Sequence, residues 1–140
     1  MTLQSSISLR VQEQELDELG HVNNACFLEY LERGRMDWYD RCDPALNKAA
    51  ERHLATVVVN IDINYRRECF SDMQLSVVTK PYTRGRTSYV LLQEIFDHEN
   101  RRVSDAKVTS VIMDMRTRKT VSMPDALARQ FTVEQNGEFS

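Results

Sequence analysis

Hydrophobic and polar residues alternate strictly near the start of the chain. Ile7, Leu9 and Val11 are separated from one another by single polar residues, Ser8 and Arg10. Successive side chains of a β-strand point to opposite faces, so a period of two is typical of a strand with one buried face. The pattern therefore predicts a strand over residues 6–12.

The period changes between residues 24 and 40. The apolar residues that recur there at helical spacing are Phe27, Leu28, Leu31 and Trp38. Asn23 stands directly before this segment, where an Asn side chain accepts a hydrogen bond from a free backbone N–H. A helix of about four turns is expected to begin after Asn23. Pro44 ends the pattern, and residues 45–52 are expected to add a short turn.

Four further segments have the composition of strands. They span residues 57–65, 75–82, 87–96 and 103–115. Each is rich in β-branched and aromatic residues, and short turn-like segments around Gly85 and Asn100 separate the last three. Such short connections predict antiparallel hairpins. Residues 125–130 are expected to form a short helix before a frayed polar tail.

The order of one strand, one helix and four strands predicts an α+β fold. In this fold a curved five-stranded antiparallel sheet wraps one long central helix. One helix covers only one face of a sheet. The uncovered face is expected to carry Val90, Leu92, Phe96, Val111 and Met113, or their odd-numbered neighbours. Exposed apolar area of this size favours association, so we expect a homo-oligomer, a dimer at least and more specifically a tetramer of paired dimers.

Composition narrows the class of protein. The chain has 140 residues, of which 41% are hydrophobic, which suits one domain over residues 1–140. Its net charge is −3 with acidic and basic residues interleaved, so neither nucleic acid nor a membrane is expected as a partner. The first residues have no basic region followed by an apolar run, and no segment approaches the length of an apolar membrane span, so we expect a soluble protein that is not exported. Three scattered cysteines, Cys26, Cys42 and Cys69, fit neither a disulfide framework nor a zinc site, which favours a cytoplasmic protein with reduced thiols.

The segment 17–24 gathers groups that can act together on a carbonyl compound. Asp17 supplies a carboxylate and His21 an imidazole, just before the predicted start of the helix at Asn24. The free N–H groups and the dipole at a helix start stabilise an oxygen that gains negative charge. A nearby carboxylate can attack the carbonyl or activate water. Gly20 would allow the sharp turn that brings these groups together.

The same segment carries a family resemblance. DELGHVNNACFLEYLERGR is similar to the pattern Asp-x-x-Gly-His-Val-Asn-Asn-x-x-Tyr-x-x-Tyr-x-Glu-x-x-Arg of the hot-dog acyl-CoA thioesterases in the 4-hydroxybenzoyl-CoA thioesterase superfamily. The matching residues are Asp17, Gly20, His21, Val22, Asn23, Asn24, Tyr30, Glu32 and Arg35. Phe27 stands where the family usually has tyrosine, and Glu15 replaces the first residue of a frequent Asp-x-Asp. The resemblance covers residues 3–115 and implies the hot-dog fold.

The resemblance also implies an activity, the hydrolysis of an acyl- or aroyl-coenzyme A to free acid and coenzyme A. It implies that Asp17 is the catalytic carboxylate, either as general base or as nucleophile. It further implies that the backbone N–H of Asn24 polarises the carbonyl and that substrate lies across a dimer interface. His21 is a candidate for direct contact with the carbonyl or water, and Asn23 is a candidate for substrate contact that fits a helix cap better.

Coenzyme A carries phosphates, which basic side chains bind. The candidates for this contact are Lys80, Arg84, Arg86 and Arg66. Glu32 and Arg35 are expected to form a structural pair on the helix, and Tyr30 and Trp38 to lie in the core or the pocket wall. No spacing of histidine, cysteine or carboxylate argues for a metal, and no cofactor is expected.

Two other interpretations stay open. The first is a hot-dog dehydratase or hydratase, which is expected to need a histidine on the central helix. No histidine follows His21 before His53, which disfavours that enzyme. The second is a non-catalytic module that binds acyl-CoA or an acyl-carrier protein, and an assay for thiol release would separate it from a hydrolase.

Overall fold

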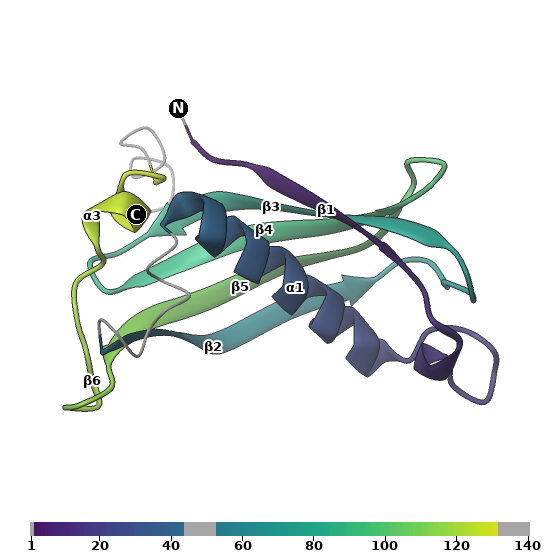
Figure 1. The fold of residues 1–140 in the computed structure, drawn as a ribbon, viewed down its shortest axis with the longest axis horizontal. Coiled ribbons are helices and arrows are strands. Elements are labelled where there is room, and N and C mark those ends of the chain that lie inside the picture. The colour runs from purple at the N-terminus through teal and green to yellow at the C-terminus, as the bar shows by residue number, and fades with distance from the viewer. Residues whose placement is uncertain (1, 44–52, 132–140) are drawn as a thin grey trace.

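A long helix lies diagonally across one face of a curved antiparallel sheet (Figure 1). The computed structural model describes residues 2–43 and 53–131, so the short turn expected at residues 45–52 lies outside the described residues. The elements are β1 (Ser5–Arg10), the 3₁₀ helix η1 (Glu13–Glu15), α1 (Asn24–Cys42), β2 (Leu54–Tyr65), β3 (Gln74–Arg84), β4 (Ser88–Asp97), β5 (Arg102–Asp114), β6 (Lys119–Thr120) and α3 (Asp125–Ala128). The predicted arrangement of one long helix on one curved sheet is confirmed.

The sheet has the strand order β1-β3-β4-β5-β2, and every neighbouring pair is antiparallel. In this order β1 and β2 are the edge strands. The two-residue strand β6 pairs with the end of β5 and was not predicted, because Lys119 and Thr120 show no alternation. The register of β3 shifts between Pro81 and Thr83, where proline has no N–H to donate to the ladder.

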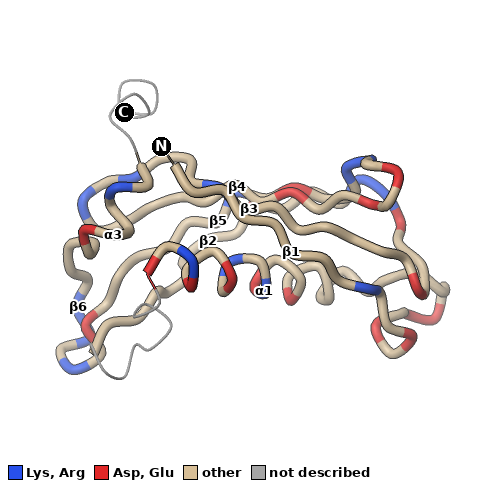
Figure 2. The backbone as a smooth tube through the Cα atoms, turned by 45° about the horizontal axis from the view of Figure 1, so that its top comes forward, with Lys and Arg blue, Asp and Glu red and all other residues tan. Residues whose placement is uncertain are grey.

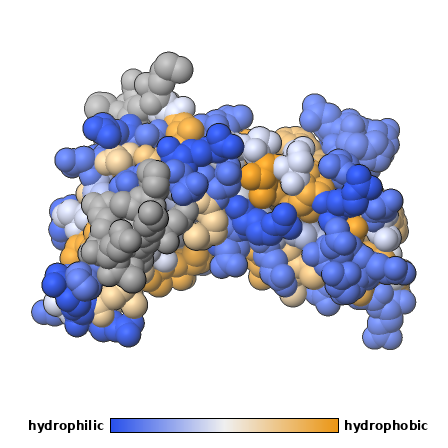
Figure 3. All heavy atoms as spheres, viewed as in Figure 1, coloured by the Kyte–Doolittle hydropathy of each residue, from blue (hydrophilic) through white to orange (hydrophobic). Residues whose placement is uncertain are grey.

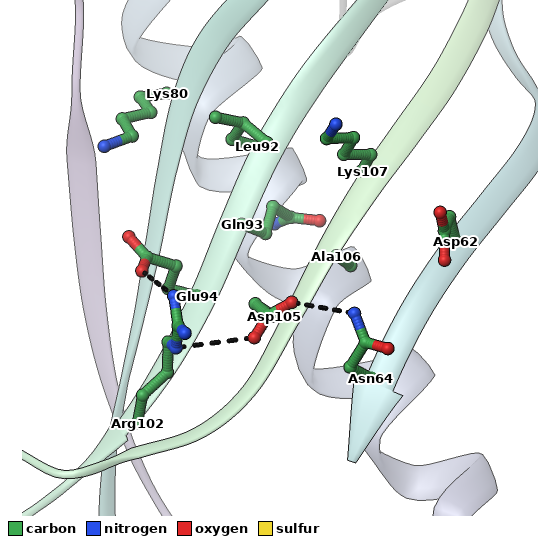
Figure 4. Close-up of a pocket in the computed structure, with 10 residues that line it drawn as sticks. All are labelled: Asp62, Asn64, Lys80, Leu92, Gln93, Glu94, Arg102, Asp105, Ala106 and Lys107. Atoms are coloured by element: carbon green, nitrogen blue, oxygen red, sulfur yellow. Dashed lines mark hydrogen bonds and ion pairs between the residues drawn. The ribbon is translucent and has the colours of Figure 1, made fainter. Parts of the chain in front are cut away.

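The two faces of the sheet differ in chemistry. Tyr89, Leu91 and Ile95 of β4 are buried and share core clusters with residues of α1. The uncovered face carries the alternating half-buried residues Val90, Leu92, Phe96, Val111 and Met113, the first of the two sets anticipated from the sequence. Its centre also carries the charged residues Asp62, Lys80, Glu94, Asp105 and Lys107 (Figure 4). The uncovered face is therefore a mixed surface and not a uniformly apolar one.

Helix α1 begins where the sequence predicts. Asn23 is its cap, and the Asn23 Oδ1 atom accepts a hydrogen bond from the Ala25 N–H at 2.9 Å. The buried residues of α1 are Phe27, Tyr30, Leu31, Gly34, Arg35, Trp38 and Tyr39. Leu28 was expected among them but is 38% exposed. A Cβ atom at Gly34 would lie 2.7 Å from the Val77 Cγ1 atom, so glycine is needed where α1 approaches β3.

Two clusters of buried residues join the helix to the sheet. The cluster near the start of α1 contains Val22, Phe27, Tyr30, Leu31, Val77 and Ile95, with others. The cluster near the end of α1 contains Trp38, Tyr39, Tyr89, Leu91, Ile112, Leu127 and Phe131. A buried polar pair lies between the two clusters along α1 and β4. In this pair Arg35 Nη1 donates to Gln93 Oε1 at 3.0 Å. Burial lowers the pKa of the Arg35 guanidinium, and the charge of Glu32 counteracts part of this effect.

Candidate active site

The segment between η1 and α1 folds into a closed loop. Leu16 pairs with Val22, and the backbone N–H of Asp17 donates to the carbonyl of His21 at 2.9 Å. The N–H of Gly20 donates to the carbonyl of Asp17 at 3.0 Å. Gly20 has a φ of 86°, a left-handed conformation that side chains disfavour and glycine adopts freely. The loop therefore holds Asp17 and His21 side by side, as the glycine in the sequence suggested.

The two carboxylate oxygens of Asp17 have different surroundings. Oδ1 accepts a hydrogen bond from the Leu19 N–H at 2.9 Å, a contact typical of a turn. Oδ2 lies 3.7 Å from the Nδ1 atom of His21. The side chains of Asp17 and His21 are 29% and 25% exposed. Oδ2 is thus the oxygen that can exchange a proton with water or with the imidazole.

His21 lies between two carboxylates. Its Nε2 atom is 3.7 Å from the Oε1 atom of Glu68, a residue of the connection between β2 and β3. The N–H of Val22 donates to the carbonyl of Cys69 at 2.8 Å, which fixes this connection to the loop. Glu68 was not predicted, because the polar connection has no periodicity that indicates a contact with the loop.

The start of α1 presents an unpaired backbone donor. The Ala25 N–H is taken by the Asn23 side chain, and the Cys26 N–H donates to the Asn23 carbonyl at 2.9 Å. Within residues 2–43 and 53–131, the N–H of Asn24 has no hydrogen-bond acceptor. Asn23 acts as the cap, while its contact with substrate stays a prediction. Free N–H groups at a helix start favour an oxygen with negative charge.

A small cavity of about 180 Å³ opens at this donor. It is lined by His21, Val22, Asn24, Phe27, Tyr65, Arg66, Arg67 and Glu68. The rings of Phe27 and Tyr65 meet edge to face with their centroids 5.5 Å apart, and they form an aromatic wall. Asp17 is not among the lining residues and adjoins the cavity through His21. Tyr65 ends a predicted strand, but alternation alone does not show that it faces a cavity.

Glu15 anchors the loop to the helix. Its Oε1 atom accepts hydrogen bonds from the Tyr30 hydroxyl at 2.7 Å and from the Gln12 N–H at 2.8 Å. Its carbonyl accepts from the Asn23 N–H at 3.0 Å. Burial, with the hydrogen bond and charge of Glu15, raises the pKa of Tyr30, so the phenol stays a donor. Glu15, which departs from the Asp-x-Asp pattern, therefore has a structural role in holding the loop against α1.

The predicted phosphate contacts lie in three places. Arg66 lines the cavity, but its guanidinium donates to the Asp105 carboxylate, which lowers the pKa of Asp105. Lys80 borders a depression of about 320 Å³ on the uncovered sheet face (Figure 4). Arg84 and Arg86 flank the β3–β4 turn, where Arg86 donates to Ser122 near α3. One chain alone does not bring Lys80, Arg84 and Arg86 to the Asp17 loop.

Charge, metal ligands, helix hydropathy and cysteines can be described for the same part of the chain. Acidic and basic residues both occur along its whole length (Figure 2). Among residues 2–43 and 53–131, no group of three His, Cys, Asp or Glu side chains is placed to hold a metal ion. None of the described helices is long and apolar enough to cross a membrane. Cys26, Cys42 and Cys69 are free thiols.

The fold and the motif at residues 17–35 together define the class of protein, a thioesterase of the hot-dog type. Residues 11–131 match the thioesterase-like superfamily, and the chain belongs to this family. This confirms the predicted family and enzyme class.

Individual relatives agree with that assignment. The long-chain acyl-CoA thioesterase FadM of Escherichia coli (strain K12) is 34% identical over 120 residues, which are 85% of this chain and 90% of the relative. The structure of the probable thioesterase YbaW from Escherichia coli has a TM-score of 0.79 at 32% identity, and the match covers 89% of this chain and 94% of that chain. A hypothetical protein from Staphylococcus aureus, solved in complex with CoA, has a TM-score of 0.85 at 12% identity, covers 93% and 82% of the two chains, and supports the fold.

Proposed function

We propose that this chain hydrolyses an acyl- or aroyl-coenzyme A to free acid and coenzyme A. The observation that carries the proposal is that His21 and Asn24, whose N–H is unpaired, line one small cavity, with the Asp17 carboxylate next to His21. The family assignment favours a thioesterase over a dehydratase or hydratase on the same fold. The acyl-CoA substrate named for the FadM relative supports coenzyme A as the acyl carrier.

In this mechanism the start of α1 binds the thioester carbonyl. The carbonyl oxygen accepts a hydrogen bond from the backbone N–H of Asn24, and the positive end of the helix dipole stabilises the charge that develops during attack. The aromatic wall of Phe27 and Tyr65 contacts the apolar atoms next to the carbonyl. Because the donor is a backbone group, the Asn24 side chain has no part in this step.

Asp17 activates the attacking water. Its carboxylate takes a proton from water as the oxygen attacks the carbonyl carbon, the C–S bond breaks, and the leaving thiolate takes up a proton. A direct attack by Asp17 would instead form an acyl-enzyme anhydride. Action through water is favoured because Asp17 does not line the cavity, so its carboxylate is not placed for direct attack on a carbonyl bound there.

A second copy of the chain is expected to complete the site. Strand β2 is an edge strand, so its outer backbone groups are free to pair with another strand. Val58 and Val59 on β2 are 42% and 57% exposed, and Figure 3 shows apolar surface along the edge of the sheet where Figure 1 places β2. Leu28 and Met36 on the open side of α1 add to this apolar surface. We therefore propose a dimer that pairs along β2, and a tetramer if two such dimers associate.

The dimer would also explain the distant basic residues. Two copies related by a two-fold axis pair their edge strands antiparallel, so opposite ends of the two chains lie side by side. The β3–β4 turn of the partner, with Arg84 and Arg86, would then approach the end that carries Asp17. Contact of these residues and of Lys80 with the phosphates of coenzyme A remains part of the proposal.

The test is thiol release from short, medium, long and aromatic acyl-CoA thioesters by the wild-type chain and by Asp17→Asn. We expect at least one thioester to be hydrolysed and the substitution to lower turnover at least about a hundredfold, the scale of general base catalysis. Circular dichroism should show that both proteins are folded. Binding of acyl-CoA without thiol release by the wild-type chain would identify a binding module, and near-normal turnover by a folded Asp17→Asn would remove Asp17 from the mechanism.

A further inference from the structure

We propose that Glu68 is the outer member of a proton path that runs from Asp17 through His21 to solvent. The inference rests on the proposed hydrolysis and concerns the proton that this reaction releases. The family motif does not include Glu68, and the contact arises from the β2–β3 connection of this chain.

The geometry is a carboxylate, an imidazole and a second carboxylate in series. Asp17 Oδ2 lies 3.7 Å from His21 Nδ1, and Glu68 Oε1 lies 3.7 Å from His21 Nε2. The two carboxylates therefore lie near different nitrogens of the same imidazole ring. An imidazole can take up a proton at one nitrogen and release another from the second, so it can pass a proton between them. Each 3.7 Å separation is longer than a hydrogen bond, so each proton transfer requires movement of a side chain or a bridging water.

Glu68 is the most exposed member of this series. The side chains of Asp17 and His21 are 29% and 25% exposed, whereas that of Glu68 is 65% exposed. Two cations, Arg66 and Arg67, line the same cavity. Arg66 donates to the Asp105 carboxylate and not to Glu68. Among the described residues, Glu68 has no ion-pair partner other than His21. Its carboxylate is therefore free to accept a proton from the ring and to give it to water.

The overall reaction requires an exit for one proton. Water and the thioester give a carboxylate, a free thiol and one proton, because the two protons of water are divided between the thiolate and the solvent. One proton of the attacking water goes to Asp17, and the other stays on the acid product, which ionises near neutral pH and supplies the proton that the leaving thiolate takes up. The proton on Asp17 is then the one that must leave. Glu68 lines the same cavity as His21 and Asn24, but its side chain is 65% exposed, so its carboxylate also reaches solvent. The path through Glu68 therefore leads from the cavity to bulk water.

The test is Glu68→Gln, which removes the proton acceptor and keeps the size of the side chain. Assayed in dilute buffer on the best acyl-CoA thioester, the variant should lose about threefold to tenfold in kcat with KM unchanged. This loss is well below the hundredfold or more expected for the base itself. Raising the concentration of a small diffusible buffer such as imidazole should restore kcat toward the wild-type value. Glu18→Gln is the matched control, since it neutralises an exposed carboxylate next to Asp17 that has no contact with His21 in the described residues.

The outcomes separate this path from the proposed function. If Glu68→Gln equals Glu18→Gln in dilute buffer while Asp17→Asn is inactive, the path is wrong and the hydrolysis mechanism stands. A loss that added buffer does not restore would show that Glu68 acts on structure, which also overturns the path. If Asp17→Asn keeps its activity, the proposed mechanism itself fails, whatever Glu68 does.

Discussion

The two ends of helix α1 meet the sheet in opposite ways. At the C-terminal end, four aromatic rings form a chain of contacts. The ring centroids are 5.6 Å apart for Trp38 and Tyr39, 6.4 Å for Tyr39 and Tyr89, and 5.7 Å for Tyr89 and Phe131. Their polar atoms have partners, since the two tyrosine hydroxyls lie 2.5 Å apart and Trp38 Nε1 donates to the Leu3 carbonyl at 2.9 Å. At its start, the Asn24 N–H has no acceptor in the described residues, and Asp17 and His21 are partly exposed.

Under the proposed mechanism, the two ends of one helix serve stability and catalysis separately. Buried aromatic rings with satisfied polar atoms contribute strongly to stability and leave nothing free for a ligand. An unpaired donor beside a carboxylate contributes little to stability, yet it is what a thioester carbonyl requires. Substitutions at the aromatic end should therefore change unfolding, and substitutions at the loop end should change turnover.

The largest expected effect on stability is at the aromatic end. Trp38→Ala removes a fully buried side chain and should cost about 3–5 kcal/mol in the free energy of unfolding. Urea unfolding followed by circular dichroism measures this loss, and kcat per folded molecule should stay near the wild-type value. Met115→Ala, at a residue that is 36% exposed, is the control and should cost far less. A small loss from Trp38→Ala would contradict the assignment of this end as the stable one.

A smaller, pH-dependent effect on stability is expected from Asp97, which ends β4 at the β4–β5 turn. Burial tends to raise the pKa of Asp97, but hydrogen bonds from the Arg101 and Glu99 N–H groups and the Arg101 guanidinium outweigh it and lower the pKa. A lowered pKa stabilises the fold above the unfolded value, about 3.9, and this contribution is lost as the pH falls through the folded value. Asp97→Asn should therefore cost about 1.5–3 kcal/mol at pH 7, with a smaller difference from wild type in acid.

The measurement for Asp97 is urea unfolding of both proteins at neutral and acidic pH. If the free energies of unfolding of the wild type and of Asp97→Asn differ by the same amount at every pH, the charge of Asp97 has no part in the stability of this hairpin.

The closeness of the candidate residues in the loop could be predicted because they are neighbours in the chain. Asp17, His21 and Asn24 lie within one turn and one helix start, where local rules for glycine and caps apply. Glu68 reaches His21 through the pairing of distant segments, which periodicity does not specify. Periodicity also does not specify the position of Arg84 and Arg86 relative to the Asp17 loop. They lie at the turn of a hairpin of long strands, away from that loop.

The smallest expected effect concerns these distant cations. Replacing Lys80, Arg84 and Arg86 together with glutamine should raise KM for a coenzyme A thioester about tenfold or less and hardly change KM for a truncated pantetheine thioester. The matched control is Arg118→Gln with Lys119→Gln at the β5–β6 turn, which changes charge without the proposed contact. Equal losses on both substrates would mean that the three cations do not hold phosphate.

The proposed mechanism depends on the backbone N–H of Asn24, which polarises the thioester carbonyl, and two substitutions at this position test that role. Asn24→Ala keeps the N–H, and Asn24→Pro deletes it at the first helical position, where proline is tolerated. We expect near-normal turnover for the alanine variant and a loss of about a hundredfold to a thousandfold for the proline variant, with both folded by circular dichroism. A folded proline variant with near-normal turnover, or an alanine variant equally impaired, would contradict it.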